Sequence, residues 1–421
     1  MKQYQTVVIG GGCAGLAAAA TLKEAGIHDV LLIEKDDELG GILQQCIHNG
    51  FGLQTFHEQL SGPQYAERLW KRMQQKQVEV KTGTMVMSIH KDRTITYVNP
   101  KEGYTTIKAD AVILCVGCYE RSRGALGIPG ERPAGIYTAG QAQRYLNIDG
   151  YLVGEKVFIL GSGDIGLIMA RRMTLEGAKV SGVAELMPYS NGLPRNIKQC
   201  LEDFGIPLFL SHTVTKIFGH DRLEGIELAQ VDENRRPIAG TEKNFAVDTL
   251  LLSCGLIPEN HLGDACGIVM DPHIKGPLVD ADYMTSVPGI FACGNGLHVH
   301  DLADFVVHQA TLAAQGCTRY LQGVKSMQKK IHAQAGQNVG YVVPGILHTD
   351  SLPKIVEFYF RVRKPIRGGT IILSSNNTVI RSIPKPYLIP SEMESVVLAG
   401  AQLKDLTDDL IIEVKENEHH G

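Results

Sequence analysis

Cysteine and histidine residues stand at spacings that can support redox or acid–base chemistry. Cys115 and Cys118 form the only CxxC pair among nine cysteines, and this spacing suggests a dithiol. Because the two cysteines flank Gly117 at a strand end, simple packing is the competing and favoured interpretation. One residue, Val299, separates His298 from His300, so on an extended chain the two histidines face the same side. No third residue stands at ligand spacing from them, and we expect no metal site.

A glycine-rich turn near residue 10 is the element expected to position this chemistry. The apolar run that starts at Val7 ends at Gly10, further glycines follow at Gly12 and Gly15, and residues 16–25 can continue as a helix. Gly10 allows a tight turn, Gly12 lets a pyrophosphate approach the backbone, and Gly15 lets the helix pack closely on the strand. The free N–H groups and the dipole of the helix favour an anion there. The pattern predicts a dinucleotide-binding unit.

A second apolar run supports this prediction. It ends at Glu34, 19 residues after Gly15, where a carboxylate can accept both hydroxyls of an adenosine ribose. We expect Glu34 and the following Lys35 to face that adenosine. The pair Gly40 and Gly41 follows. Strand, glycines, helix, strand and acid in register are far more specific than the glycines alone.

The same unit occurs a second time. Gly10 and Gly161 are 151 residues apart, and Glu34 and Glu185 are also 151 residues apart. We therefore predict two dinucleotide-binding units with equal internal spacing. The second nucleotide site is expected to comprise these residues: Gly161, Gly163, Asp164, Ile165, Gly166, Glu185 and Gly255.

The remaining chain supplies helices, strands and a separate tail. Helices are expected at 61–76 and 301–321 from helical spacing of apolar residues. Similar strand-then-glycine runs at 110–117 and 248–255 close the two units. Residues 323–340 are rich in Gln, Lys and Gly and are predicted to be a linker. Residues 341–421 are predicted to form a small, mostly antiparallel β domain.

Composition excludes several functional classes. The chain has 421 residues, 44% hydrophobic and 20% charged, with a net charge of -4 that is spread without long runs. This is the composition of a globular protein, and it gives no case for binding nucleic acid or an anionic membrane surface. The apolar stretch at 7–20 is too short and too glycine-rich to span a membrane. Irregular cysteine spacing suggests reduced thiols, and a cytoplasmic location is expected.

These motifs resemble the flavoproteins with two dinucleotide-binding domains, the wider group of pyridine nucleotide-disulfide oxidoreductases. The resemblance covers about residues 1–322 and also includes the strand that runs from Gly289 to Gly294. The segments 117–121, 128–130 and 133–140 look like the flavoprotein subunits of opine, sarcosine and cyanide-forming oxidases. The segments 46–52 and 295–301 look like a bacterial flavoprotein that accompanies a glycerol-3-phosphate dehydrogenase.

The resemblance implies the fold class, the domains and the cofactors. The expected fold is α/β, with two Rossmann-like domains and a small C-terminal β-rich domain. The FAD-binding domain would be split into 1–122 and 256–322 by an inserted NAD(H)-binding domain at 123–255, followed by the linker at 323–340 and the β domain at 341–421. FAD would contact the first site, which we expect to comprise these residues: Gly10, Gly12, Cys13, Ala14, Gly15, Glu34, Lys35, Gly41, Val86, Gly117, Gly294 and Asn295.

The chain departs from the family pattern at two places. Disulfide reductases of this group carry CxxxxC soon after the Gly-Gly pair or CxxC in the nucleotide domain, whereas Cys46 stands alone. Cys46 could be a sulfenic-acid or mixed-disulfide centre, could shape the flavin pocket without redox chemistry, or could simply pack in a core. The usual flavin-binding Gly-Asp is Gly294-Asn295 here, and its amide carries no charge.

Side chains near the expected flavin site are candidates for catalysis. We select Cys46, His48, His298 and His300, the histidines for an acid/base or anion-binding role or, alternatively, as hydrogen-bonded structural groups. Asp301 and Asp304 are expected to cap the helix that follows. Glu185 would accept a 2′-hydroxyl and repel a 2′-phosphate, so NADH is favoured over NADPH.

The predicted activity is that of an FAD-dependent NAD(H) oxidoreductase, in which electrons pass between nicotinamide and a second partner through the flavin. That partner would be a dehydrogenase, such as one acting on glycerol 3-phosphate, or an electron-acceptor protein, with the β tail as a docking module; homo- or hetero-oligomers both stay open. The alternatives are a stand-alone NADH oxidase, peroxidase or disulfide reductase using Cys46 or the Cys115/Cys118 pair, and a non-catalytic FAD-binding scaffold.

Overall fold

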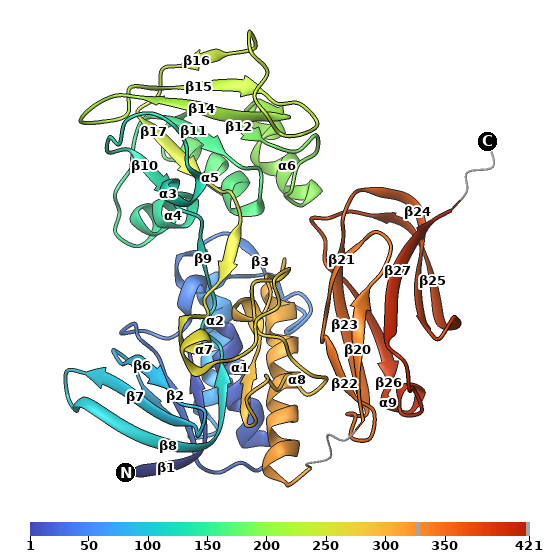
Figure 1. Ribbon diagram of the computed structural model, residues 1–421. Helices are drawn as coiled ribbons and strands as arrows, with labels where there is room; N and C mark the ends of the chain where they lie inside the picture. Colours follow the sequence, from blue (N-terminus) through green and yellow to red (C-terminus); the bar gives the residue numbers. More distant parts are fainter. Residues whose placement is uncertain (325–328, 418–421) are drawn as a thin grey trace. The chain divides into compact units, whose positions relative to one another are not determined.

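The computed structural model describes residues 1–324 and 329–417, which divide into two compact units (Figure 1). One unit contains Met1–Cys118 together with the described residues from Pro258 onward, and the other contains Tyr119–Ile257. The chain leaves the first unit through β9 (Cys118–Glu120) and returns through β18 (Leu256–Pro258). Both units have Rossmann-type parallel sheets, and a β-rich domain follows, so the predicted α/β class is confirmed.

The first unit is built on a seven-stranded sheet. Its order is β5-β2-β1-β8-β7-β6, with β19 paired to β8. The central strands are parallel and apolar on both faces, as expected where helices cover a sheet. The strand bounds are β1 Lys2–Ile9, β2 Val30–Ile33, β5 Glu79–Lys81, β6 Met85–Ile89, β7 Thr94–Asn99, β8 Gly103–Leu114 and β19 Ile290–Ala292.

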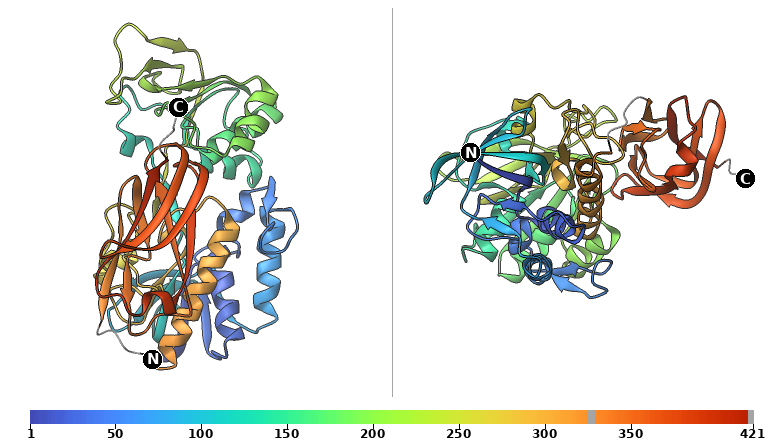
Figure 2. Two further views of the ribbon diagram at one scale, coloured as in Figure 1. Left: turned by 90° about the vertical axis from the view of Figure 1, so that its right-hand side faces the viewer. Right: turned by 90° about the horizontal axis from the view of Figure 1, so that it is seen from below.

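Three long helices belong to this unit: α1 (Cys13–Glu24), α2 (Gly62–Gln74) and α8 (Ala303–Leu321). All three were predicted, at 16–25, 61–76 and 301–321. Small alanine side chains let α1 pack closely against α8, and Figures 1 and 2 show the two helices side by side. Short elements complete this part: η1 Gly41–Gln45, β3 Asn49–Phe51, β4 Leu60–Ser61, α7 His261–Cys266 and η3 Gly294–Gly296.

The second unit repeats the arrangement on a smaller scale. Its five-stranded parallel sheet has the order β10-β17-β11-β12-β13, and α5 follows β11 as α1 follows β1. A separate antiparallel sheet contains β14 to β16. The bounds are α3 Arg123–Leu126, β10 Ile136–Thr138, α4 Ala139–Asn147, β11 Lys156–Leu160, α5 Asp164–Leu175, β12 Lys179–Glu185, α6 Pro194–Cys200, η2 Glu202–Phe204, β13 Leu208–Leu210, β14 His212–Phe218, β15 Gly225–Gln230, β16 Lys243–Phe245 and β17 Thr249–Leu252.

The C-terminal segment forms the expected β-rich domain with its own apolar core. Two sheets have the orders β22-β20-β27-β24-β25 and β21-β23-β26. Asn376 and Asn377, both with positive φ, form the tight turn between β24 and β25. The bounds are β20 Lys330–Ala335, β21 Val339–Val343, β22 Ile346–His348, β23 Ile355–Val362, β24 Ile366–Ser375, β25 Thr378–Leu388, β26 Glu394–Ala399, α9 Gly400–Leu403 and β27 Leu410–Glu416.

The predicted linker at 323–340 differs from the structure in its described part. Residues 325–328 lie outside the described residues, as do 418–421 of the predicted β domain. Lys330–Ala335 form β20, which pairs with β22 and β27. Ile331 and Ala333 alternate with polar residues, which is a strand pattern, but the many Gln and Lys residues around them favoured a linker in the prediction. This stretch is therefore part of the β domain.

Candidate functional site: two nucleotide loops and a buried polar cluster

The first glycine turn follows β1 and has no room for side chains at two of its glycines. Gly10 has a φ of 106°, and an added Cβ would lie 2.3 Å from the carbonyl oxygen of Cys115. An added Cβ at Gly15 would lie 1.8 Å from the carbonyl oxygen of Gly10. These contacts fix the strand, the turn and α1 against one another.

Gly12 is different because an added Cβ there would meet no atom within 4 Å. It is the N-cap residue of α1, and no side chain caps the helix. The first N–H groups of a helix have no partners within it, so those of α1 can bind an anion that approaches over Gly12. Cys13 and Ala14 begin the helix. This turn therefore fits the pyrophosphate that its sequence predicted.

Glu34 and the Gly-Gly pair close the loop on its other side. The buried carboxylate of Glu34 accepts hydrogen bonds from Gly11 N at 2.5 Å and from Asp36 N at 2.8 Å. Each carboxylate oxygen has a second lone pair, which can accept a ribose hydroxyl. Gly40 N donates to Gly11 O, and an added Cβ at Gly41 would lie 3.2 Å from Cα of Gly12. The next residue, Lys35, is exposed.

The ends of β8 and β19 meet at the same sheet edge. Gly117 has a φ of 75° and open space on its Cβ side, and an added Cβ at Gly296 would lie 3.4 Å from Gly117 N. Gly294 N donates to the side chain of Gln309 at 2.9 Å. Asn295 accepts a hydrogen bond from His300 N through Oδ1 at 3.0 Å. These residues lie together although about 180 positions separate them in the chain.

Val86, another predicted cofactor contact, lies on β6 and is 6% exposed. Its side chain is part of the apolar core that the sheet buries, so any contact with a cofactor would come from its backbone. The structure gives no further support for this residue.

The second glycine turn repeats the first. Gly161 has a φ of 100° and packs on Ser253 O, and Gly166 packs on Gly161 O. Gly163 is the N-cap of α5, and no side chain caps it. Glu185 accepts hydrogen bonds from Ser162 N at 3.1 Å and from Met187 N at 3.0 Å.

The other three residues predicted to contact the nucleotide in this unit have different surroundings from one another. Asp164 accepts hydrogen bonds from Leu193 N at 2.8 Å and from Asn196 at 2.7 Å, so its carboxylate holds the segment before α6. Ile165 packs against the apolar core of the unit. Gly255 is exposed, with a φ of 99° and open space on its Cβ side, like Gly117.

Cys46 and His48 follow η1. The Cys46 thiol donates to Ile42 O at 3.3 Å, and burial raises its pKa to about 12. A thiol in this state is a poor nucleophile at neutral pH, which weighs against the sulfenic-acid and mixed-disulfide interpretations. The ring of His48 lies 5.2 Å from that of Phe51, centre to centre.

The two thiols that lie closest together in the fold are not the pair that the CxxC spacing suggests. The sulfur of Cys115 lies 3.4 Å from that of Cys293, because β8 and β19 pair side by side. The pKa of Cys115 is raised by this contact and by burial. Cys118 accepts a hydrogen bond from Asn295 Nδ2 at 3.7 Å. The spacing of the CxxC pair thus did not reveal that Cys115 contacts Cys293.

His298 and His300 are 1% and 7% exposed. Burial lowers the pKa of both imidazoles, that of His300 to about 3, so both are neutral at physiological pH. They face Tyr341 and Tyr359 of the β domain. A group that neither titrates near pH 7 nor reaches solvent is poorly suited to exchange protons with a free substrate.

Asp301 and Asp304 do not cap α8 as predicted, since Leu302 is the N-cap and no side chain caps the helix. Asp304 accepts hydrogen bonds from Gly52 N at 3.1 Å and from Thr55 N at 3.0 Å. It therefore ties α8 to the loop that follows β3. Asp301 forms an ion pair with Arg361 of β23. Sequence reasoning missed both roles because the partners are 60 or more positions away.

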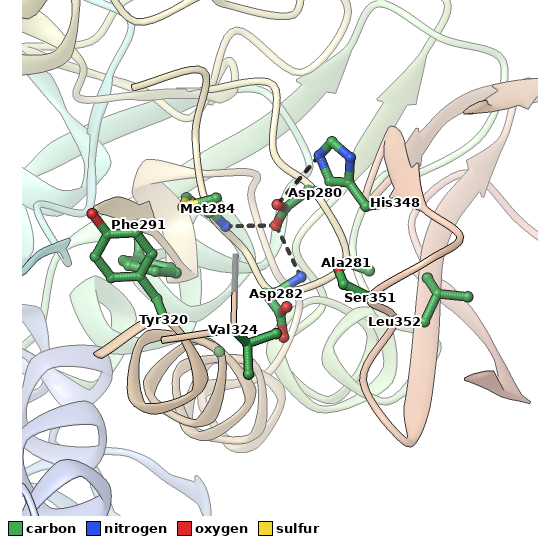
Figure 3. Close-up of a pocket in the computed structure, with 11 residues that line it drawn as sticks. Asp280, Ala281, Asp282, Met284, Phe291, Tyr320, Val324, His348, Ser351 and Leu352 are labelled. Atoms are coloured by element: carbon green, nitrogen blue, oxygen red, sulfur yellow. Dashed lines mark hydrogen bonds and ion pairs between the residues drawn. The ribbon is translucent and has the colours of Figure 1, made fainter. Parts of the chain in front are cut away.

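A shallow pocket lies elsewhere in the first unit, where the C-terminal end of α8 meets the β domain (Figure 3). Asp280 accepts hydrogen bonds from Asp282 N and Met284 N, both at 2.9 Å, and its second oxygen lies 3.8 Å from His348 Nε2. Burial, with the charge of Asp282, raises the pKa of Asp280 to about 7. Burial raises that of Asp282 to about 6.

Metal-binding clusters and membrane-spanning helices are both absent from the described part of the chain. Among residues 1–324 and 329–417, no group of three or more His, Cys, Asp or Glu side chains is arranged to hold a metal ion. Within the same ranges, no helix has both the length and the apolar character needed to cross a bilayer.

Comparison with known families agrees with this geometry. The model of the pyridine nucleotide-disulphide oxidoreductase family matches residues 4–316, which include both glycine turns and both acids. The chain belongs to this family. Its members are oxidoreductases that use FAD and a nicotinamide nucleotide, as the resemblance predicted. Both turns fit such ligands, because each has an uncapped helix start, a buried acid and an N-cap glycine at which an added Cβ would meet no atom closer than 3.6 Å.

Individual relatives are distant. The chain is 24% identical to the HcnB subunit of hydrogen cyanide synthase from Pseudomonas protegens over 319 residues, which is 71% of this chain and 65% of that one. It is 24% identical to an opine oxidase subunit from Agrobacterium tumefaciens over 357 residues, 79% of this chain and 70% of that one. The thioredoxin reductase of T. acidophilum has a similar fold, with a TM-score of 0.63, 23% identity, and coverage of 76% of this chain and 99% of that one.

Proposed function

We propose that the chain is an FAD-dependent NADH oxidoreductase whose first unit binds FAD and whose second unit binds NAD(H). The repeated pattern, in which an acid accepts backbone hydrogen bonds beside a glycine turn, carries this proposal: two nucleotide sites in one chain suit electron transfer between two cofactors. Bound FAD would supply the redox chemistry by accepting hydride from the nicotinamide. The protein binds and orients the cofactors and excludes water.

Each unit contributes defined residues to these tasks. In the first, Gly12 admits the pyrophosphate to the N–H groups of α1, and Glu34 accepts the adenosine hydroxyls. In the second, Gly163 and Glu185 have the same duties. Gly117, Gly294 and Asn295 meet at the sheet edge where we expect the flavin end of FAD, and Lys35 lies at its adenosine end.

Glu185 favours NADH because its carboxylate repels a 2′-phosphate. One cation near Tyr189 bears on this preference. Burial raises the pKa of Tyr189, and both Glu185 and Arg235 act electrostatically on its hydroxyl. Arg235 comes from a turn about 50 residues later. NADPH would bind well only if Arg235 outweighed the repulsion between Glu185 and the 2′-phosphate.

A finer proposal concerns the second electron partner. We infer a partner dehydrogenase, such as one acting on glycerol 3-phosphate, with this chain as the subunit that couples it to NAD. The resemblance of segments 46–52 and 295–301 supports the idea, and two of the relatives are themselves named as subunits. A cytoplasmic location, expected from the free cysteines, belongs to the same proposal.

Thiol chemistry is less well supported. Burial raises the pKa of Cys46, and Cys115 contacts Cys293 inside the core. No observation favours a peroxidase or a disulfide reductase over direct hydride transfer.

Anaerobic titration of the FAD-loaded protein with NADH and NADPH tests the main proposal. NADH should bleach the flavin absorbance, and NADPH should do so more slowly. If neither bleaches it, the chain is a binding scaffold and the proposal is wrong. Affinity purification from the native host tests the finer proposal, which fails if no dehydrogenase is recovered with the chain.

A further inference from the structure

His298 and His300 lie together inside the first unit, between the turn at Gly294–Asn295 and the β domain. Their ring centres are 4.3 Å apart, and the ring of Tyr359 lies 5.7 Å from the first and 6.1 Å from the second. One nitrogen on each imidazole is buried without a hydrogen-bond partner: Nδ1 of His298 and Nε2 of His300. Such atoms are rare in folded proteins because a buried polar atom without a partner is destabilising.

The hydrogen bonds of Gln309 fix the tautomer of His298. Gln309 is fully buried, and its Oε1 accepts a hydrogen bond from Gly294 N at 2.9 Å. Its Nε2 must then be the amide nitrogen, which donates to His298 Nε2 at 2.7 Å. A neutral imidazole that accepts at Nε2 carries its proton at Nδ1. The unpartnered atom of His298 is therefore an N–H donor.

The tautomer of His300 follows in the same way. Its Nδ1 lies 2.9 Å from the carbonyl oxygen of His298, which can only accept, so Nδ1 carries the proton. The unpartnered Nε2 of His300 is therefore an acceptor. A free donor on one ring thus lies beside a free acceptor on the other. The ring of Tyr359 packs near both imidazoles, whereas its hydroxyl interacts with Glu357 and Tyr283.

A metal ion does not fit this pair. Coordination through Nδ1 of His298 would need the lone pair that the Gln309 contact replaces with a proton. A hydroxyl group fits, since it accepts from His298 and donates to His300 at the same time. Arg361 is the cation that faces both rings, and Asp301 neutralises it, so no net charge calls for an ion here.

We propose that His298 and His300 form a buried binding site for one hydroxyl group, with the ring of Tyr359 packed beside it, and that a water molecule occupies the site in the resting protein. The site links the β domain to the turn at Gly294–Asn295 through Gln309, so it positions a turn that we assign to FAD. This last role rests on the proposed function, whereas the hydroxyl site itself does not.

A crystal structure of the full chain, at a resolution that shows ordered waters, tests the site directly. Crystals grown without polyols should show one peak within hydrogen-bond distance of both His298 Nδ1 and His300 Nε2. Crystals soaked in glycerol distinguish the two sources, because the peak either stays a water or extends into an alcohol. An empty site in both crystals, or a direct hydrogen bond between the two rings, overturns the proposal.

Nitrogen-15 spectra of histidine-labelled protein provide an independent measurement. Both rings should stay neutral with the proton at Nδ1 between pH 5 and 8. His308 is the contrasting case, because its hydrogen bond with Glu357 raises its pKa, and it should carry charge over part of this range. A charged ring or an Nε2–H tautomer at either position contradicts the assignment.

The positioning role is tested with His300→Phe, which removes the acceptor, and with Tyr341→Phe, a control that keeps the ring facing His298 and removes only a hydroxyl that interacts with Arg361. We expect FAD to dissociate several-fold faster from H300F and at the normal rate from Y341F. Equal rates in all three proteins refute the positioning role. If even the unaltered chain retains no FAD, the proposed function fails, while the crystal and the spectra of the unloaded protein still decide the hydroxyl site.

Discussion

Glu34 and Glu185 accept equivalent backbone hydrogen bonds, and Glu185 accepts one more, from the hydroxyl of Ser162 at 2.6 Å. Glu34 accepts from the N–H groups of Gly11 and Asp36, and Glu185 accepts from those of Ser162 and Met187. Both donors of the second set stand 151 residues after their counterparts in the first. Each acid is therefore oriented by its own glycine turn before any nucleotide binds.

Replacing Glu185 with Gln should weaken NAD⁺ binding by about tenfold, because a charge-assisted hydrogen bond to the ribose becomes a neutral one. NADP⁺ binding should change little or improve, since the charge that repels a 2′-phosphate is removed. Calorimetric titration with each nucleotide measures the ratio of the dissociation constants of NAD⁺ and NADP⁺. An equal loss for both would show that Glu185 acts through the fold of the turn and has no role in discrimination.

Replacing Glu34 with Gln is the matched change in the first unit. We expect the dissociation constant of FAD to rise by about tenfold, for the same reason, while NAD⁺ affinity stays unchanged. Fluorescence of released flavin after dilution reports the first quantity. Should E34Q lose NAD⁺ and keep FAD, the assignment of the two units would be reversed.

Three glycines of the first turn should respond differently to alanine. Gly12→Ala places a methyl in open space, so the unfolding free energy of the flavin-free protein should change by no more than about 0.5 kcal/mol while FAD binding falls sharply. Gly10→Ala and Gly15→Ala place it against backbone and should cost about 1–3 kcal/mol or more. Urea unfolding of the flavin-free proteins measures this. A destabilised G12A would contradict a ligand-reserved space.

The sequence was sufficient to predict both nucleotide units, because their signals are local. A strand, a turn, a helix and an acid follow one another within about 25 residues, and backbone sterics decide which positions need glycine. The tight turn at Asn376–Asn377 was predictable for the same reason, since it depends on two adjacent residues.

Contacts between distant segments were not predictable in this way. Cys115 faces Cys293 because β8 and β19 are neighbours, which the CxxC spacing does not encode. Asp304 was expected to cap its own helix but binds Gly52 and Thr55. The burial of His298 depends on strands that begin about 40 residues later. Local pattern identifies the polar residue, and tertiary packing decides its partner.

Cys46 should be chemically inert at neutral pH. Burial raises its pKa to about 12, so very little of the thiol is ionised at pH 7. Iodoacetamide should therefore label Cys46 far more slowly than a small-molecule thiol, as followed by mass spectrometry. Cys46→Ser should keep NADH-dependent flavin reduction, and loss of peroxide turnover in C46S would restore the thiol hypothesis.

The ion pair between Arg361 of the β domain and Asp301, which precedes α8, should stabilise the first unit. Its side chains are 20% and 13% exposed, so Arg361→Met leaves a half-buried carboxylate and should cost about 3 kcal/mol. Lys364→Met is the control, because its partner Glu416 is also exposed and such pairs contribute about 0–1 kcal/mol. Urea unfolding compares the two, and similar losses would refute the role of burial.

The raised pKa of Asp280 should make the stability of the protein depend on pH. Its folded pKa, about 7, is above the unfolded value near 3.8, so the folded state binds the proton more tightly. As pH rises from about 4 to 7, the unfolded chain loses this proton first, and the folded state becomes less stable by up to about 1.4 kcal/mol per pH unit. Above pH 7 the folded carboxyl also ionises, and the loss levels off.

Asp280→Asn removes this titration while keeping an oxygen that can accept from Asp282 N and Met284 N. The melting temperature of D280N, relative to the unaltered chain, should therefore rise between pH 5 and pH 8. A difference that stays constant with pH would show that Asp280 is ionised in the folded protein, held by the nearby imidazole of His348.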